Sequence, residues 1–209
     1  MPLLIIGAVL AILVYVPSFW VRHIMAKHSK EIAELPGTGG ELAKHLIERF
    51  ELTGITVEEA APNTDHFDPA GPVVRLSPDN FNGRSLTAVA VAAHEVGHAM
   101  QFHRGEKIFE LRKRYLPMAA RFNRVGVVIM MTIPFIALLI RMPLVIGGVI
   151  ALSLLLQLAG AFAYLIILPE EWDASFNKAL PVLIEGEYIE AAHMPAVRQV
   201  LKAAALTYF

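Results

Sequence analysis

The sequence predicts a mainly α integral membrane protein, with about three transmembrane helices and a cytoplasmic α+β region. Three observations lead to this fold class. Hydrophobic residues make up 56% of the 209 residues, which exceeds the roughly 45–50% of a typical soluble domain. The apolar residues are concentrated in three blocks that contain no charged side chain. The polar segment between the first two blocks combines helical periodicity with short strand-like runs.

The same composition excludes several other classes of protein. So much apolar sequence is incompatible with intrinsic disorder. The chain has no cysteine, so it contains no disulfide scaffold, thiol nucleophile or cysteine-ligated zinc finger. Its formal net charge is −1, which gives no support for nucleic-acid binding. We therefore expect no nucleic-acid partner.

The first uncharged block, residues 1–21, predicts transmembrane helix 1, because a membrane-spanning helix needs about 20 apolar residues. A signal peptide carries its positive charges before the apolar block and a small-residue cleavage site after it. Here Arg22, Lys27 and Lys30 follow the block, and no such cleavage site is present. We expect an uncleaved helix with its N-terminus outside the cell.

The other two uncharged blocks, residues 125–140 and 142–168, predict transmembrane helices 2 and 3. The first of them is short, so we expect its helix to include preceding neighbours; a buried helix of a soluble core is the alternative. Lysine and arginine residues near the ends of spans mark the cytoplasmic side, and they follow the first block and precede the second. Residues 22–124 and 169–209 are therefore predicted to be cytoplasmic, which makes the last two spans a hairpin.

The cytoplasmic region 22–124 contains both helical and strand-like patterns. Residues 38–53 show apolar side chains at helical spacing, and Thr38 with Glu41 resembles a capping box. Residues 54–57 and 73–77 are predicted strands, separated by a turn at residues 68–72.

A second helix is predicted to begin after Ser85 as N-cap and to run to about Phe102. It is rich in alanine and glycine, so other elements can pack closely against it. This helix contains His94-Glu95-Val96-Gly97-His98. Two histidines four residues apart lie on one helix face, so their imidazoles can converge on one metal ion, and zinc suits such ligands. Glu95 lies about 100° round the axis, where it can take a proton from a water at the metal. A hydrogen-bonded core triad is the alternative reading of the motif.

A catalytic zinc site needs a third protein ligand. A histidine ten residues after His94 would supply it in one class of metalloprotease, but that position is Arg104. The alternative is an acid from a later helix, and acids follow the third block directly. There Pro169 and the residues after it predict a helix start, and the hairpin returns this segment to the side of the histidines. Glu171 and Ser175 share a helix face, so one of them can bind the metal while the other supports it. Helical periodicity alone does not exclude Glu170 as an alternative ligand.

At this point the sequence resembles the YugP-type neutral zinc metallopeptidases of bacterial membranes, and more distantly the HtpX membrane proteases. The resemblance extends from about residue 36 to the end. It is carried by six segments: T-D-H-F-D-P (64–69), V-V-R-L-S (73–77), G-R-S-L (83–86), V-A-A-H-E-V-G-H-A-M-Q (91–101), P-E-E-W-D-A-S (169–175) and A-A-A-L-T-Y (203–208).

The resemblance implies a zincin-like (gluzincin) catalytic region. The distant relatives carry an E-x-x-x-D motif, and its alignment with this chain selects Glu171 as the third ligand. Ser175 then occupies the position where those relatives have aspartate. Asp173 is the candidate that replaces this aspartate as the carboxylate bonded to a metal ligand. Family members usually continue past the A-L-T-Y segment into another hydrophobic helix. We therefore expect either that a further span is missing from this chain or that this member lacks one.

Two other segments are candidates for contact with substrate. In zincins generally, an edge strand at the position of residues 73–77 pairs with the substrate backbone; ordinary sheet structure is the alternative. His66 is a candidate donor to the oxyanion that develops on the scissile carbonyl, with a structural role in the turn as the alternative.

The sequence thus predicts a membrane-embedded zinc endopeptidase of the bacterial inner membrane, multi-pass, with its active site facing the cytoplasm. One Zn²⁺ is held by His94, His98 and Glu171, and Glu95 activates the water. The expected partners are the lipid bilayer and a protein or peptide substrate; the likeness to HtpX implies membrane-protein quality control. The alternatives are a non-catalytic scaffold or adaptor with a structural zinc site, and a metal carrier. A structural site has no need of Glu95, and the ligands lie outside the predicted spans, whereas transport sites lie near the midplane.

Overall fold

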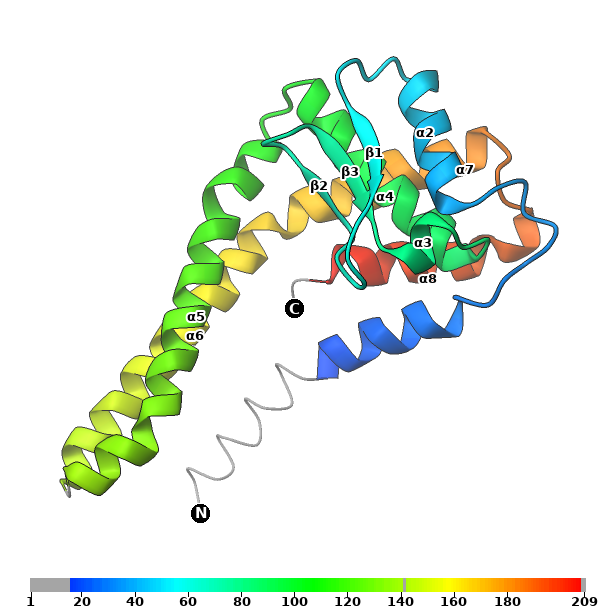
Figure 1. Cartoon of the computed structure of the whole chain (residues 1–209). Helices are drawn as coiled ribbons and strands as arrows, with labels where there is room; N and C mark the ends of the chain where they lie inside the picture. Colours follow the sequence, from blue (N-terminus) through cyan, green and yellow to red (C-terminus); the bar gives the residue numbers. More distant parts are fainter. Residues whose placement is uncertain (1–15, 141, 208–209) are drawn as a thin grey trace. The chain divides into compact units, whose positions relative to one another are not determined.

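A computed structural model describes residues 16–140 and 142–207 of the chain. The described chain is mainly α, with one small sheet (Figure 1). It divides into two compact units: the described residues up to Phe109 together with those from Pro169 on, and residues Glu110–Leu168. Most of predicted transmembrane helix 1 lies outside the described residues; residues 16–27 are helical.

The first unit holds most of the helices and the sheet. Its helices are α2 (Gly39–Arg49), α3 (Pro78–Phe81), α4 (Leu86–His103), the π-helix η1 (Asp173–Ala179), α7 (Leu180–Glu185), the 3₁₀-helix η2 (Ala191–His193) and α8 (Met194–Ala205).

Two of the predicted helix starts are confirmed. The Thr38 hydroxyl accepts from Glu41 N and the Glu41 carboxylate accepts from Thr38 N, at 3.2 and 2.8 Å, which is the predicted capping box. Ser85 caps α4 by accepting from Ala88 N.

The sheet contains β1 (Thr56–Glu59), β2 (His66–Asp68) and β3 (Val73–Leu76), in the order β1-β3-β2. β1 runs parallel to β3 and β2 runs antiparallel to it. The prediction that residues 73–77 form an edge strand is therefore wrong, because neighbours occupy both edges of β3. The short β2 was not predicted; it pairs with β3 from within a segment rich in turn-forming residues.

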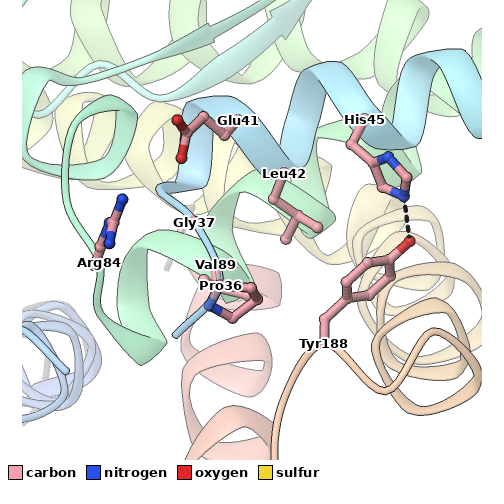
Figure 2. Close-up of a pocket in the computed structure, with 8 residues that line it drawn as sticks. All are labelled: Pro36, Gly37, Glu41, Leu42, His45, Arg84, Val89 and Tyr188. Carbon is pink, nitrogen blue, oxygen red and sulfur yellow. Dashed lines mark hydrogen bonds between the residues drawn. The ribbon is translucent and has the colours of Figure 1, made fainter. Parts of the chain in front are cut away.

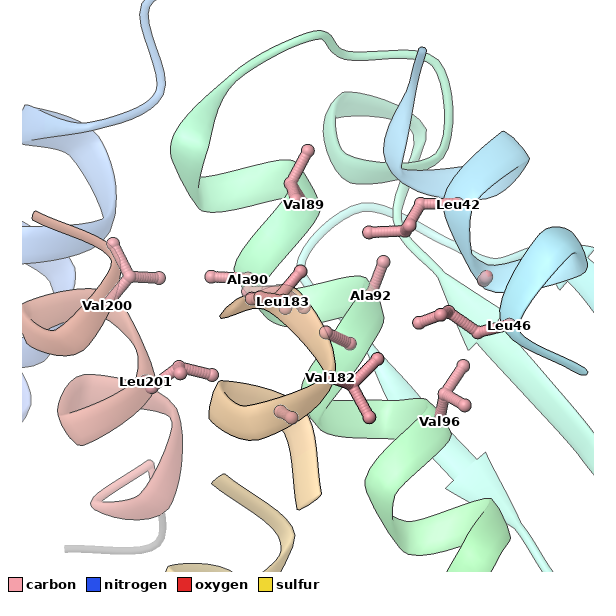
Figure 3. Packing of buried hydrophobic residues seen from close by; sticks show 14 of the residues in the cluster. Leu42, Leu46, Val89, Ala90, Ala92, Val96, Val182, Leu183, Val200 and Leu201 are labelled. Atoms are coloured by element: carbon pink, nitrogen blue, oxygen red, sulfur yellow. The ribbon is translucent and has the colours of Figure 1, made fainter. Parts of the chain in front are cut away.

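Helix α4 lies at the centre of the first unit. Every residue from Ser85 to Gln101 is buried, and Figure 3 shows apolar side chains of α2, α7 and α8 around it. Such close packing on several sides is possible because most side chains of α4 are small. The polar motif at its middle is consequently held inside the core of the first unit.

The second unit consists of the parts of α5 (Phe109–Leu139) and α6 (Pro143–Trp172) that lie within residues 110–168. The two helices approach closely at small residues: the Ser153 hydroxyl donates to Gly126 O at 2.8 Å, and a Cβ on Gly160 would lie 3.2 Å from Ala119 O. Two helical stretches, Phe109–Leu139 and Pro143–Glu185, are long and apolar enough to cross a membrane, by length and composition.

The predicted helix start at Pro169 is wrong. α6 continues through Pro169 to Trp172, and η1 follows without a break. Proline removes one backbone hydrogen bond inside a helix, yet α6 continues here, and the Glu170 backbone oxygen accepts from Gln101 Nε2 of α4. Glu170 and Glu171 are therefore not exposed acids at a helix N-terminus; both are buried.

Candidate metal centre

Three potential ligand atoms converge between α4 and the end of α6. His94 Nε2 and His98 Nε2 are 3.2 Å apart, and Glu171 Oε2 lies 3.3 Å from the first and 3.2 Å from the second. The three side chains are at most 5% exposed. In the described part of the chain they form a group able to hold a metal ion.

The hydrogen bonds on the far side of each imidazole determine which nitrogen carries the proton. His94 Nδ1 lies 2.9 Å from the Ser175 hydroxyl, whose own hydrogen is donated to Leu201 O at 2.9 Å. The serine oxygen must therefore accept, and His94 Nδ1 must donate. His98 Nδ1 lies 3.0 Å from Gln101 Oε1, another acceptor. Both neutral imidazoles are thus assigned the Nδ1–H tautomer.

This assignment leaves a bare lone pair on each Nε2. Together with the Glu171 carboxylate, three acceptors then lie within 3.3 Å of one another. Acceptors at that spacing repel unless a cation lies between them. Zinc bonds of about 2.0–2.2 Å at tetrahedral angles place neighbouring ligand atoms about 3.3–3.5 Å apart, which is close to the spacing here. The two histidines and the acid fit a zinc ion better than they fit a hydrogen-bonded core triad.

Glu95 lies next to His94 on α4 and is 6% exposed. Its Oε2 is buried and has no hydrogen-bond partner among the described residues. A buried carboxylate oxygen without a partner is costly. The arrangement suits a group whose partner is a water or a substrate.

A polar network supports His98 from the side opposite the three ligand atoms. Gln101 Nε2 donates to Asp173 Oδ2 at 2.9 Å and to Glu170 O at 3.0 Å, so its oxygen is turned toward His98. Lys178 Nζ donates to Asp173 Oδ2, and also to Glu106 Oε2 at 2.9 Å.

Asp173 is an anion held by this network. Burial raises the pKa of Asp173, but hydrogen bonds from Lys178, Gln101 and Asn177 outweigh it and hold that pKa below its usual value. The network therefore carries a fixed negative charge that orients the Gln101 amide.

Gly97 lets the two ligand-bearing segments meet. A Cβ on Gly97 would lie 2.6 Å from the backbone oxygen of Ala174 in η1, and a methyl group does not fit there. π-helical turns occur frequently at functional sites, and this one follows Glu171 by two residues and contains Ser175. η1 can therefore pack closely on α4 because the H-E-x-x-H motif has a glycine, with no side chain, at this position.

The structure brings together most of the predicted site residues, but some contact the histidines directly and others only through a third residue. Glu171 joins the two histidines, whereas Glu170 Oε1 lies 2.7 Å from His98 Nδ1, on the other edge of that ring. Ser175 contacts His94 directly, and Asp173 reaches His98 only through Gln101. His66 lies on β2 with Nδ1 against Thr64 O at 2.7 Å, outside the metal-binding group.

The sequence reasoning missed Gln101. Its spacing of three residues from His98 on one helix face was the signal that could have identified it as the acceptor for that ring.

A separate cavity of about 350 Å³ lies elsewhere in the first unit. Figure 2 shows that its lining includes His45, whose Nε2 lies 2.8 Å from the Tyr188 hydroxyl. The other lining residues are Pro36, Gly37, Glu41, Leu42, Arg84 and Val89. None of them belongs to the metal-binding group.

Comparison with known proteins agrees with this geometry. The "Putative membrane protease YugP" of Bacillus subtilis (strain 168) is 34% identical over 198 residues, which cover 91% of this chain and 83% of that protein. No solved structure matches the chain. Residues 3–209 match the family described as "Putative neutral zinc metallopeptidase", and the chain therefore belongs to that family.

Proposed function

We propose that the protein is a zinc-dependent endopeptidase embedded in the bacterial inner membrane, with its active site facing the cytoplasm. In this proposal one Zn²⁺ is held by His94, His98 and Glu171. The observation that carries the proposal is the convergence of three acceptor atoms within 3.3 Å, while both Nδ1 atoms are engaged elsewhere. The family and its relative's name support a peptide as the substrate.

A zinc ion bound by these residues would polarise a peptide carbonyl and make a water more acidic. Glu95 takes a proton from that water through Oε2 as the water oxygen attacks the carbonyl carbon. Glu95 then passes the proton to the nitrogen of the leaving amine as the peptide bond breaks. Ser175 and Gln101 keep both imidazoles in the tautomer that presents Nε2 to the metal.

Insertion into the membrane is supported by the exposed apolar surface of the second unit. Met131, Phe135 and Leu144 are 70%, 68% and 87% exposed, and few residues in the most apolar part of α5 are buried. A core helix of a soluble domain would be mostly covered. Exposed apolar surface of this extent is suited to lipid, and Arg112 to Arg124 would lie on the cytoplasmic side.

A scaffold or adaptor with a structural zinc site is the second candidate function. A closed structural site has four protein ligands, whereas three converge here. The buried Glu95 oxygen, which has no partner among the described residues, also favours catalysis. By resemblance to HtpX, we propose membrane-protein quality control as the role.

The full chain, purified in detergent, tests the activity. It should cleave an unstructured protein substrate, lose this activity to a strong chelator and regain it when zinc is added back. Zinc bound at one ion per chain without any cleavage of several unstructured substrates would favour the scaffold.

Cysteine labelling tests the proposed orientation without an enzyme assay, because the chain has no native cysteine. Lys107→Cys and Glu190→Cys, both at exposed positions of the first unit, should react with an impermeant reagent only after the inner face is opened. Leu144→Cys, near the start of α6, should react from outside. Labelling of Lys107→Cys and Glu190→Cys from opposite sides would contradict the hairpin.

A further inference from the structure

Glu170 takes part in the site although it is not one of the three converging ligands. Its side chain is completely buried, and its Oε1 lies 2.7 Å from His98 Nδ1. The backbone oxygen of the same residue accepts from Gln101 Nε2 at 3.0 Å. The main chain of Glu170 is therefore fixed at the rear of His98, and its carboxylate lies in close contact with that ring.

Two successive acids lie against the two edges of one imidazole ring. His98 Nε2 lies 3.2 Å from Glu171 Oε2, and His98 Nδ1 lies 2.7 Å from Glu170 Oε1. Neighbouring residues on a helix point about 100° apart, so one turn of α6 can place its two carboxylates on either side of a ring that projects between them. The pair Glu170-Glu171 thus has two different tasks.

The two histidines differ in what supports them. His94 Nδ1 meets a neutral hydroxyl, that of Ser175. His98 Nδ1 is hydrogen-bonded to the neutral Gln101 oxygen at 3.0 Å, and the Glu170 carboxylate adds a charge contact 2.7 Å from the same nitrogen. A carboxylate behind a metal-binding imidazole fixes the ring and raises its basicity more than a neutral acceptor does. His98 is accordingly the more strongly supported of the two.

We propose that Glu170 is a positioning residue that strengthens zinc binding through His98, by supplying negative charge at Nδ1. This inference rests on the proposed zinc site and deepens it. Glu170 touches neither the metal nor the substrate; it acts through the ring of His98.

The test compares zinc binding and unfolding of the full chain with those of Glu170→Gln, which keeps the shape and an acceptor oxygen but removes the charge. Zinc affinity, measured by competition with a chromophoric chelator, should fall about 10- to 100-fold, while saturating zinc still gives one ion per chain. Glu185→Gln, an exposed acid on α7, is the matched control and should bind zinc like the wild type.

Thermal unfolding distinguishes the charge effect from simple packing. Ligands that bind only the folded state raise its melting temperature, and the rise grows with the logarithm of their affinity. Glu170→Gln should therefore show a smaller zinc-induced rise, while the melting temperature of the zinc-free protein is unchanged or higher. Equal lowering of both temperatures would mean that Glu170 serves packing alone and would overturn the proposal.

A third variant keeps the proposal testable if Glu170→Gln does not fold. Glu170→Asp retains the charge and should retain tighter zinc binding than Glu170→Ala. Equal affinities for these two variants would contradict a charge effect. The wild type separates this inference from the proposed function: no zinc binding by the wild type defeats the zinc site itself, whereas tight binding by both wild type and Glu170→Gln defeats only the role of Glu170.

Discussion

The two units of the chain differ in where they place residues that are unfavourable in that position: the first buries a polar group within its apolar core, and the second exposes large apolar side chains. In the first unit, α4 and the end of α6 bury His94, His98 and Glu171, while in the second unit large apolar residues such as Leu144 are exposed. Each arrangement is unfavourable in water by itself, since buried acceptors require a partner and broad apolar surface requires cover. The difference agrees with the proposed function, in which the first unit holds a cation at its core and the second unit lies in lipid.

In both units, nevertheless, a glycine allows two helical segments to approach closely. Gly97 lets η1 approach α4 in the first unit, as Gly126 lets α6 approach α5 in the second. In the first unit the close approach brings metal ligands together. In the second it gives a hairpin whose apolar side chains face outward.

Glu171→Ala should break the first unit's site with the largest effect. The variant removes the carboxylate from the three-ligand group, so zinc should be lost after gel filtration. Cleavage should fall more than it does when a residue bonded to a ligand is lost, which costs about 10- to 100-fold. Elemental analysis and a peptide cleavage assay measure the two effects, with Glu185→Ala as the control. Full zinc retention by Glu171→Ala would move the third ligand elsewhere.

Gly97→Ala should destabilise the first unit by about 1–3 kcal/mol, because its methyl group would meet the Ala174 backbone oxygen at 2.6 Å. Denaturant unfolding of the zinc-free protein measures the change. Gly71→Ala is the matched control, since a Cβ there has no neighbour within 4 Å. If both variants unfold alike, close packing of η1 on α4 is not what the glycine provides.

Ser175→Ala sharpens the contrast between the two imidazoles. It removes the acceptor of His94 Nδ1 and a hydrogen bond to Leu201 O. Zinc affinity should fall about 10-fold, the lower end of the range expected for Glu170→Gln, because the serine acceptor is neutral. Chelator competition measures the two variants side by side; a larger loss in Ser175→Ala would reverse the ranking of the histidines.

Ser153→Ala addresses the second unit and should have the smallest effect. It removes the hydrogen bond to Gly126 O, and interhelical hydrogen bonds in membranes contribute about 0.6 kcal/mol on average. Unfolding in mixed detergent micelles should shift slightly, with zinc affinity unchanged. A loss of zinc in this variant would show that the two units are coupled.

Features that depend on neighbouring residues were predictable from the sequence. The start of α4 at Ser85, the capping box at Thr38 and the spacing of His94 and His98 are local patterns, and the structure contains all three. The contact of one carboxylate with each edge of the His98 ring was not predictable from the sequence. Glu170 and Glu171 are adjacent, and periodicity alone does not say which carboxylate faces which edge of the ring.

Features that depend on distant pairing were missed or misread. The central place of β3 follows from its pairing with β2, whose three residues lie among turn-forming neighbours. Pro169 has the local signature of a helix start, yet α6 runs through it. This segment contacts α4, where Gln101, 69 residues earlier in the sequence, donates to the backbone oxygen of Glu170.

The most direct test of the account is Glu95→Gln, measured for zinc content and for cleavage in the same preparation. Glu95 is assigned the proton transfer and no place among the ligands, so zinc should remain near one ion per chain. Cleavage should fall by about 10²–10⁴-fold, the usual contribution of a general base. Loss of zinc, or cleavage at the wild-type rate, would contradict the assignment of Glu95 as the base beside a zinc ion held by His94, His98 and Glu171.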